Sequence, residues 1–119
     1  VEPFEGTKST AEILIHPSGL FLYNSNRGQP DSTTPEGDAI VGFSIDQETG
    51  LLTLIGHTIE EIAVPWSFDF DASGSWLYAA NYGDSSITQF AIDQSSGELT
   101  FTGERTPVAI PFVIQLSKP

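Results

Sequence analysis

The chain has 119 residues, enough for one small domain with a buried core, and 39% of them are hydrophobic. Its 16 acidic residues against 4 basic ones give a net charge of −12, so it repels phosphate backbones and anionic lipids. We therefore expect no nucleic-acid or membrane partner, and the lack of cysteine excludes disulfides, thiolate metal sites and a cysteine nucleophile.

Two similar units follow one another along the chain. Residues 11–28 and 66–83 each contain a short strand pattern, a turn with glycine, and a second strand pattern that ends in a polar cluster and a glycine. Their matching residues are 55 positions apart. In chain order, the alternation of apolar and polar residues predicts strands over 11–15, 20–26, 39–45, 51–55, 66–70, 76–81, 86–92 and 98–102.

The spacing of these units is typical of β-propeller blades, each a four-stranded antiparallel sheet. Residues 111–116 restart the first-strand pattern. We therefore predict an all-β fold over 1–119: two four-stranded antiparallel sheets plus one extra inner strand, forming a partial propeller. The predicted blades are 11–56 and 66–103, with the extra inner strand over 111–116. A two-sheet β-sandwich is the alternative.

Two blades cannot close a propeller ring, which needs about four to eight. The chain also begins at Val1 rather than at a methionine or a signal peptide, which indicates the inside of a longer protein. The expected partners are therefore the remaining blades of a longer chain or further copies of this one. An apolar flank bearing Phe43, Phe90 and Leu99 is expected to drive this association. We expect a soluble protein and favour the cytoplasm.

Several segments together resemble a known family. They are His16-Pro17-Ser18-Gly19, Leu22-Tyr23-Asn24-Ser25-Asn26-Arg27-Gly28 and Ile45-Asp46 followed by Thr49-Gly50. The whole chain resembles the last two blades of the seven-bladed lactonases, which include 6-phosphogluconolactonases and carboxy-cis,cis-muconate lactonizing enzymes. The resemblance implies that a small carboxylated or phosphorylated acid, or its lactone, is the substrate, and that no cofactor is needed.

The sequence departs from that family at one position. The family usually has Pro-Arg where this chain has Pro65-Trp66, and the resemblance assigns that arginine to the substrate carboxylate. This departure favours the alternative function, a non-catalytic propeller fragment or binding scaffold that closes by oligomerisation.

Propeller topology places the candidate site residues on one face. Glu12 starts a first strand, whereas Asn26 and Arg27 end a second strand, as Asn81 does in the next unit. Glu12 is the candidate acid/base and Arg27 the candidate anion clamp, because a guanidinium holds a carboxylate with two hydrogen bonds. The alternative is a structural ion pair between Glu12 and Arg27. Asn26, Asn81 and His57, the last in the loop between the units, are the candidate substrate-binding residues.

Other polar and aromatic residues receive structural interpretations. His16 and its counterpart Asp71 lie in turns on the opposite face and are expected to cap turn backbone. We expect no metal site. We interpret the segment that contains Asp31, Glu36 and Asp38 as a solvated acidic loop. Trp66, Phe68 and Phe70 alternate along a strand, and we assign them to the core between the blades.

Overall fold

The structure is a computed structural model that describes residues 8–28, 38–109 and 115–116. The described residues form eight strands, one 3-10 turn, η2 (Tyr82–Asp84), and no α-helix. The strands are β1 (Lys8–Ile15), β2 (Phe21–Gly28), β3 (Ala39–Ile45), β4 (Leu52–Thr58), β5 (Pro65–Phe70), β6 (Trp76–Asn81), β7 (Ser86–Ile92) and β8 (Leu99–Pro107).

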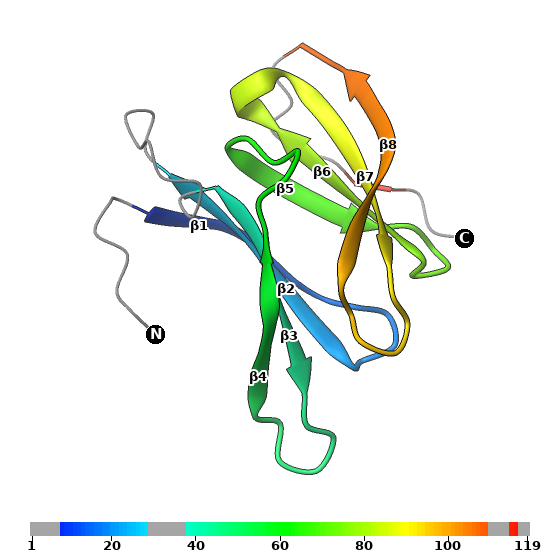
Figure 1. The fold of residues 1–119 in the computed structure, drawn as a ribbon. Coiled ribbons are helices and arrows are strands. Elements are labelled where there is room, and N and C mark those ends of the chain that lie inside the picture. The colour runs from blue at the N-terminus through cyan, green and yellow to red at the C-terminus, as the bar shows by residue number, and fades with distance from the viewer. Residues whose placement is uncertain (1–7, 29–37, 110–114, 117–119) are drawn as a thin grey trace.

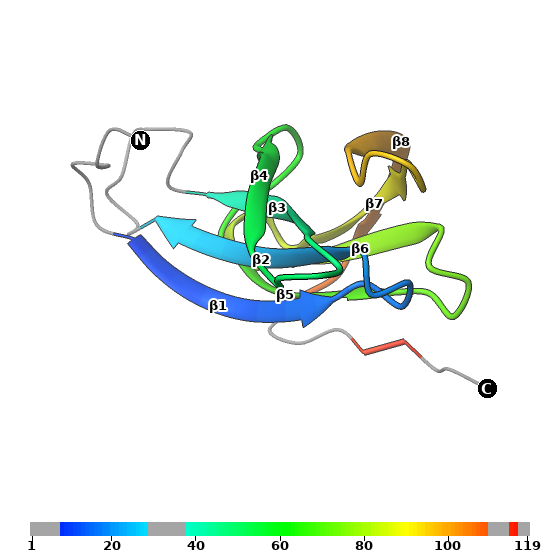
Figure 2. The same cartoon turned by 90° about the horizontal axis from the view of Figure 1, so that it is seen from below.

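The strands form two four-stranded antiparallel sheets, ordered β1-β2-β3-β4 and β5-β6-β7-β8 (Figure 1). Each sheet is strongly twisted, and the first meets the second through β1 and β2 packed against β5 (Figure 2). The predicted all-β fold with two antiparallel blades is confirmed. Most of the predicted extra strand lies outside the described residues. At its end, the N–H of Leu116 donates a hydrogen bond to Oδ2 of Asp69 (2.9 Å), which holds the chain end against β5.

The outer strands end later than predicted, β4 by three residues and β8 by five (58 − 55 and 107 − 102). Each outer pair has a register irregularity, between Gly42 and Phe43 of β3 and between Thr88 and Phe90 of β7. Pairing resumes beyond each irregularity and continues to Thr58, opposite Ile40, and to Pro107, opposite Ser86. Residues that were expected in loops therefore belong to edge strands.

The core lies between the two sheets, where alternate side chains of each strand meet. The first sheet contributes Phe21, Tyr23 and Ile40, and the second sheet places Phe68, Phe70, Leu77 and Phe90 against them. Phe68 and Phe70 confirm the predicted core between the blades. The Tyr23 hydroxyl also donates a hydrogen bond to the carbonyl oxygen of Gly97, in the turn between β7 and β8 (2.6 Å). This bond fixes the position of the first sheet on the second.

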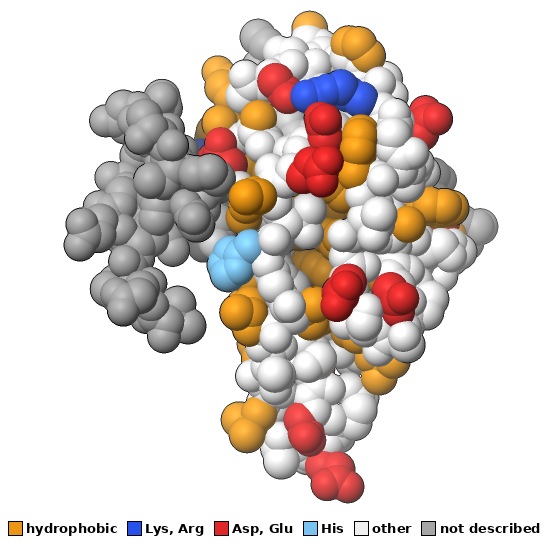
Figure 3. Space-filling model, viewed as in Figure 1, with side chains coloured by type: hydrophobic (Ala, Val, Ile, Leu, Met, Phe, Trp, Pro, Cys, Tyr) orange, Lys and Arg blue, Asp and Glu red, His pale blue; other side chains and the backbone are white. Residues whose placement is uncertain are grey.

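The predicted apolar flank was wrong for Phe90 and Leu99, whereas Phe43 lies half-buried on the outer face of the first sheet, paired with Leu54. Phe90 is fully buried and Leu99 packs against the core, because both face the first sheet. The exposed apolar surface is instead the outer face of the first sheet, where Ile13, Ile15 and Leu54 are each about half exposed or more. Figure 3 shows hydrophobic side chains along the flank of β4.

His16 joins the β1–β2 turn to the β5–β6 turn. Its Nδ1 accepts from the N–H of Ser18 (3.1 Å), so Nε2 carries the hydrogen that it donates to the carbonyl oxygen of Gly74 (2.7 Å). The ring is buried, with Phe21 and Phe70 edge-on to it at 5.7 and 5.3 Å. The structural role predicted for His16 is confirmed, and it extends across both blades.

The β3–β4 and β7–β8 turns share one hydrogen-bonding pattern, in which an aspartate accepts from backbone N–H groups of the turn. Asp46 accepts from two backbone N–H groups, and Asp93, 47 residues later, accepts from the N–H groups of Ser95 and Ser96 at 2.8 Å each. The hydroxyl of Ser95, followed by these backbone bonds, lowers the pKa of Asp93 to about 2. Both carboxylates thus stabilise their turns in the ionised form.

We expect His16→Ala to lower the free energy of unfolding by about 1–3 kcal/mol, because the buried carbonyl of Gly74 loses one of its two donors, the other being Nε2 of Gln94 (3.1 Å), and the buried ring leaves a space. Urea denaturation followed by far-UV circular dichroism measures this. His57→Ala is the matched control and should change stability by less than about 0.5 kcal/mol, since His57 is exposed. Equal effects of the two substitutions would contradict the role assigned to His16.

Stability should also fall in acid, in a window that the turn carboxylates set. A carboxyl whose pKa is lowered on folding stabilises the folded state above its unfolded pKa, about 3.9, and that contribution is lost as the pH falls toward the folded value. For Asp93 the window runs from about pH 4 to about pH 2. Denaturation midpoints between pH 6 and pH 2 should therefore fall less for Asp93→Ala than for the parent chain. Parallel curves would show that Asp93 does not contribute.

Candidate functional site

The candidate site lies where β1 and β5 begin and β2 and β6 end. Lys8 pairs with Gly28 in the first sheet, and Pro65 pairs with Asn81 in the second, so these four strand ends share one end of the molecule (Figure 1). The first strand of each sheet has a register irregularity close to this end. The extra residue is Ala11 in β1 and Trp66 in β5, which are 55 positions apart in the repeat.

Arg27, Trp66 and Tyr82 form a cluster at this end, contributed by β2, β5 and η2. The guanidinium carbon of Arg27 lies 4.0 Å from the centre of the Trp66 ring, a cation–π arrangement. Tyr82 packs edge-on against the same indole, with ring centres 6.0 Å apart. The Arg27 and Trp66 side chains are half-buried and Tyr82 is 40% exposed, so the cluster lies at the surface between the blades.

Glu12 lies on the same face of the first sheet as Arg27. Glu12 pairs with Ser25, which is two residues before Arg27 on β2, and its backbone N–H donates to the Ser25 hydroxyl (3.1 Å). Residues two apart on a strand point to the same side, here toward the second sheet. The structure therefore brings Glu12 and Arg27 onto one surface. The acid/base role and the alternative ion pair both stay predictions.

The three expected substrate-binding residues do not gather there. Asn26 alternates with Arg27 and faces the other side of β2, where its Oδ1 accepts from Nδ2 of Asn24 (2.7 Å). Asn81 is fully buried; its Oδ1 accepts from the N–H of Ala63 (3.1 Å) and its Nδ2 donates to the Thr88 hydroxyl (2.9 Å). The Asn81 side chain thus holds the segment between the two sheets.

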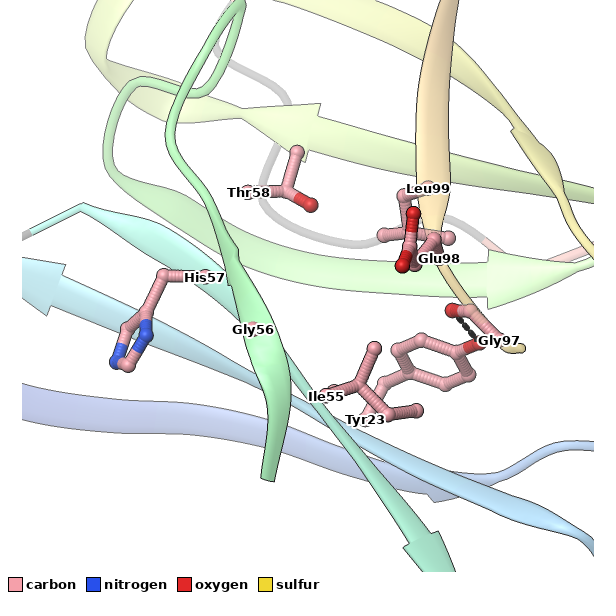
Figure 4. Close-up of a pocket in the computed structure, with 9 residues that line it drawn as sticks. Tyr23, Ile55, Gly56, His57, Thr58, Gly97, Glu98 and Leu99 are labelled. Carbon is pink, nitrogen blue, oxygen red and sulfur yellow. Dashed lines mark hydrogen bonds between the residues drawn. The ribbon is translucent and has the colours of Figure 1, made fainter. Parts of the chain in front are cut away.

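His57 lies in β4 rather than in the expected loop, since β3–β4 pairing continues to Thr58. It pairs with Val41 and is exposed on the outer face of the first sheet. Figure 4 shows its ring on the opposite side of β4 from Tyr23. The structure thus places His57 on the outer face of the first sheet and Arg27 on the inner face, and the substrate-binding role of His57 stays a prediction.

A hollow of about 220 Å³ lies between β4 and the start of β8 (Figure 4). Its lining is Tyr23, Gly42, Ile55, Gly56, His57, Thr58, Gly97, Glu98 and Leu99. The lining includes the carboxylate of Glu98 and no lysine or arginine. This hollow therefore does not suit an anionic ligand, and it is formed by the outer strands rather than by the strand ends that carry Arg27.

Arg105 is a second cation near the candidate site. It lies beyond the strand predicted over 98–102. Because β8 continues to Pro107, its guanidinium reaches Oε2 of Glu61 (3.1 Å) and Oδ2 of Asp84 (2.6 Å). It also donates to the Ser86 hydroxyl (2.7 Å). Two carboxylates match its charge, so Arg105 links β8 to η2 and to the segment between the sheets.

Among the described residues, no cluster of three or more histidine, aspartate and glutamate side chains is arranged to hold a metal ion. The same residues contain no helix that is long and apolar enough to cross a membrane.

The architecture is that of two adjacent β-propeller blades, with a cationic and aromatic cluster where β2 ends, β5 begins and η2 follows β6. The family model described as "Lactonase, 7-bladed beta-propeller" matches residues 1–116. The chain belongs to the seven-bladed propeller lactonase family.

Two relatives of known name are 6-phosphogluconolactonases. A 6-phosphogluconolactonase of Formosa agariphila is 42% identical over 90 residues, covering 76% of this chain and 24% of the relative. One of Yersinia pestis is 35% identical over 105 residues, covering 88% of this chain and 28% of the relative. The chain therefore spans about a quarter of the length of these relatives.

Solved structures agree with the fold. A putative 6-phosphogluconolactonase of Bacteroides uniformis superposes with a TM-score of 0.78 at 28% identity, covering 90% of this chain and 29% of that one. The periplasmic gluconolactonase of Pseudomonas aeruginosa has the same TM-score at 25% identity, covering 93% and 29%. Both resemble this chain over two blades.

Proposed function

We propose that this chain is part of a lactonase-type propeller that hydrolyses or forms the lactone of a small carboxylated or phosphorylated acid. The observation that carries the proposal is the position of Arg27 on the same face as Glu12, at the strand ends shared by the two blades. A guanidinium binds carboxylate or phosphate with paired hydrogen bonds, and a carboxylate transfers protons. The names of the relatives point to 6-phosphogluconolactone as the first substrate to test.

The hydrolysis needs two proton movements. Water attacks the lactone carbonyl carbon, and Glu12 takes a proton from that water as the new C–O bond forms. The ring C–O bond then breaks, and Glu12 returns the proton to the departing alkoxide oxygen. Arg27 holds the acidic group of the substrate throughout, which fixes the carbonyl relative to Glu12. The products are the open-chain hydroxy acid and an unchanged Glu12.

A second candidate function is a non-catalytic propeller fragment or scaffold completed by other blades. Trp66 stands where the family usually has arginine, which removes one expected anion ligand. The outer face of the first sheet supports the need for further blades. Ile13 and Ile15 are 61% and 60% exposed, whereas their counterparts 55 residues later, Phe68 and Phe70, are 1% and 3% exposed. The equivalent face is thus covered in one blade and uncovered in the other.

Glu12→Gln should lower the rate of 6-phosphogluconolactone hydrolysis about 10²- to 10⁴-fold, because an amide cannot accept the proton. Arg27→Ala should weaken 6-phosphogluconate binding by about 1.5–3 kcal/mol per lost charged hydrogen bond. Glu48→Gln, an exposed carboxylate in the turn at the opposite end, is the control and should change neither. Hydrolysis is measured against the spontaneous rate; parent and Glu12→Gln chains with equal rates would refute the acid/base role.

The chain by itself should associate as its concentration rises, because the outer face of the first sheet is apolar. Ile15→Glu should shift sedimentation equilibrium toward the 12.8 kDa monomer. Leu51→Glu is the matched control, since Leu51 is also exposed but lies at a turn rather than on the sheet face. A parent chain that stays monomeric at high concentration would exclude closure by oligomerisation.

A further inference from the structure

We infer that Trp66 is a positioning residue that holds the guanidinium of Arg27 for anion binding. The inference rests on the proposed role of Arg27. Arg27 belongs to the first blade and Trp66 to the second, and the two stack at 4.0 Å across the junction. A guanidinium that lies flat on an aromatic face keeps its N–H groups in the ring-parallel plane, where they can form paired bonds to a planar carboxylate.

The backbone that leads to Trp66 has a conformation that side chains disfavour. Glu61 has a φ of 59° and Val64 a φ of 45°, both in the left-handed region. A β-branched residue such as Val64 rarely adopts this conformation, which costs on the order of 1–3 kcal/mol where it persists. Pro65 and Trp66 follow directly, so the unfavourable backbone determines how Trp66 enters β5.

Several contacts hold this segment in place. Asn81 accepts from the N–H of Ala63 (3.1 Å), and the carbonyls of Ala63 and Val64 accept from the N–H groups of Gly83 and Tyr82 (3.0 Å each). A Cβ at Gly83 would lie 2.9 Å from Cγ2 of Val64, so the close approach of η2 to the segment requires glycine. These contacts hold η2 against the segment, and Tyr82, the first residue of η2, packs edge-on against the Trp66 ring.

The register irregularity adds a second cause. Trp66 is the extra residue between two ladder pairs, and such a residue turns its side chain out of the regular alternation. The first blade has the same irregularity, but its extra residue, Ala11, is not aromatic. The aromatic platform is therefore specific to the junction at which Arg27 lies.

The test uses the 119-residue chain with 6-phosphogluconate as the probe and isothermal calorimetry as the measure of binding. Trp66→Leu removes the aromatic face but keeps an apolar side chain, and Trp66→Phe keeps a ring. Trp76→Leu is the control, because Trp76 is 38% exposed and lies on another surface of the second sheet. Thermal melts check that each variant folds.

We expect Trp66→Leu to weaken binding about three- to thirty-fold, Trp66→Phe to recover most of the affinity, and Trp76→Leu to bind as the parent does. If Arg27→Ala loses binding while Trp66→Leu keeps the parent affinity, the positioning role is wrong and the proposed function stands. If Arg27→Ala binds as tightly as the parent, the proposed anion clamp is wrong instead.

A second measurement needs no ligand. In a Trp76→Phe background Trp66 is the single tryptophan, since the chain has two. Adding Arg27→Ala should uncover one face of the indole and increase acrylamide quenching of its fluorescence. Unchanged quenching would show that Arg27 does not stack on Trp66 in solution, and would overturn the inference even if the chain binds no 6-phosphogluconate.

Discussion

The packing of the first sheet on the second is the interaction on which the rest of the structure depends. Phe21 and Tyr23 on one side meet Phe68, Phe70 and Phe90 on the other, and burial of each such side chain contributes about 1.5–3 kcal/mol. Apolar packing alone would let the sheets slide. The bonds from Tyr23 to Gly97 and from His16 to Gly74 cross the junction at two points and fix its register.

The candidate site is a product of that junction. Arg27 belongs to one blade and Trp66 to the other, so neither blade alone contains the pair. The segment between the sheets has unfavourable backbone angles at Glu61 and Val64, and buried Asn81 compensates with hydrogen bonds. Backbone strain that the surrounding contacts hold in place is frequent at functional sites. Here it lies directly before the residue that contacts Arg27.

The two blades differ in what their equivalent faces contact. The face that bears Phe68 and Phe70 is covered by the first sheet, whereas the equivalent face with Ile13 and Ile15 is exposed. A propeller blade normally has a neighbour on each side, because both faces of its sheet carry apolar residues. We propose that another blade covers this exposed face; the chain matches the seven-bladed family model and spans about a quarter of the length of the relatives that it matches.

Sequence patterns were sufficient for the sheets, the turns and the pairing order, because strand alternation and glycine turns are local properties. The repeat also predicted the structural role of His16. The face on which a polar residue lies was harder: Asn26 is next to Arg27 in sequence but faces the opposite side of β2. Propeller topology and side-chain chemistry, supported by the resemblance to the lactonases, predicted Glu12 and Arg27 as site residues, and the structure brings these two onto one surface.

Only the tertiary structure decided which residues surround Arg27. Strand β8 continues beyond its predicted end, and Arg105 therefore reaches Glu61 and Asp84. Strand β4 also continues, so His57 lies on an exposed edge strand and not beside Arg27. The stacking of Trp66 on Arg27 joins residues 39 positions apart (66 − 27) through contact between separate sheets. Alternation along a strand determines that a side chain is buried, but the register and the packing of the sheets determine what it touches.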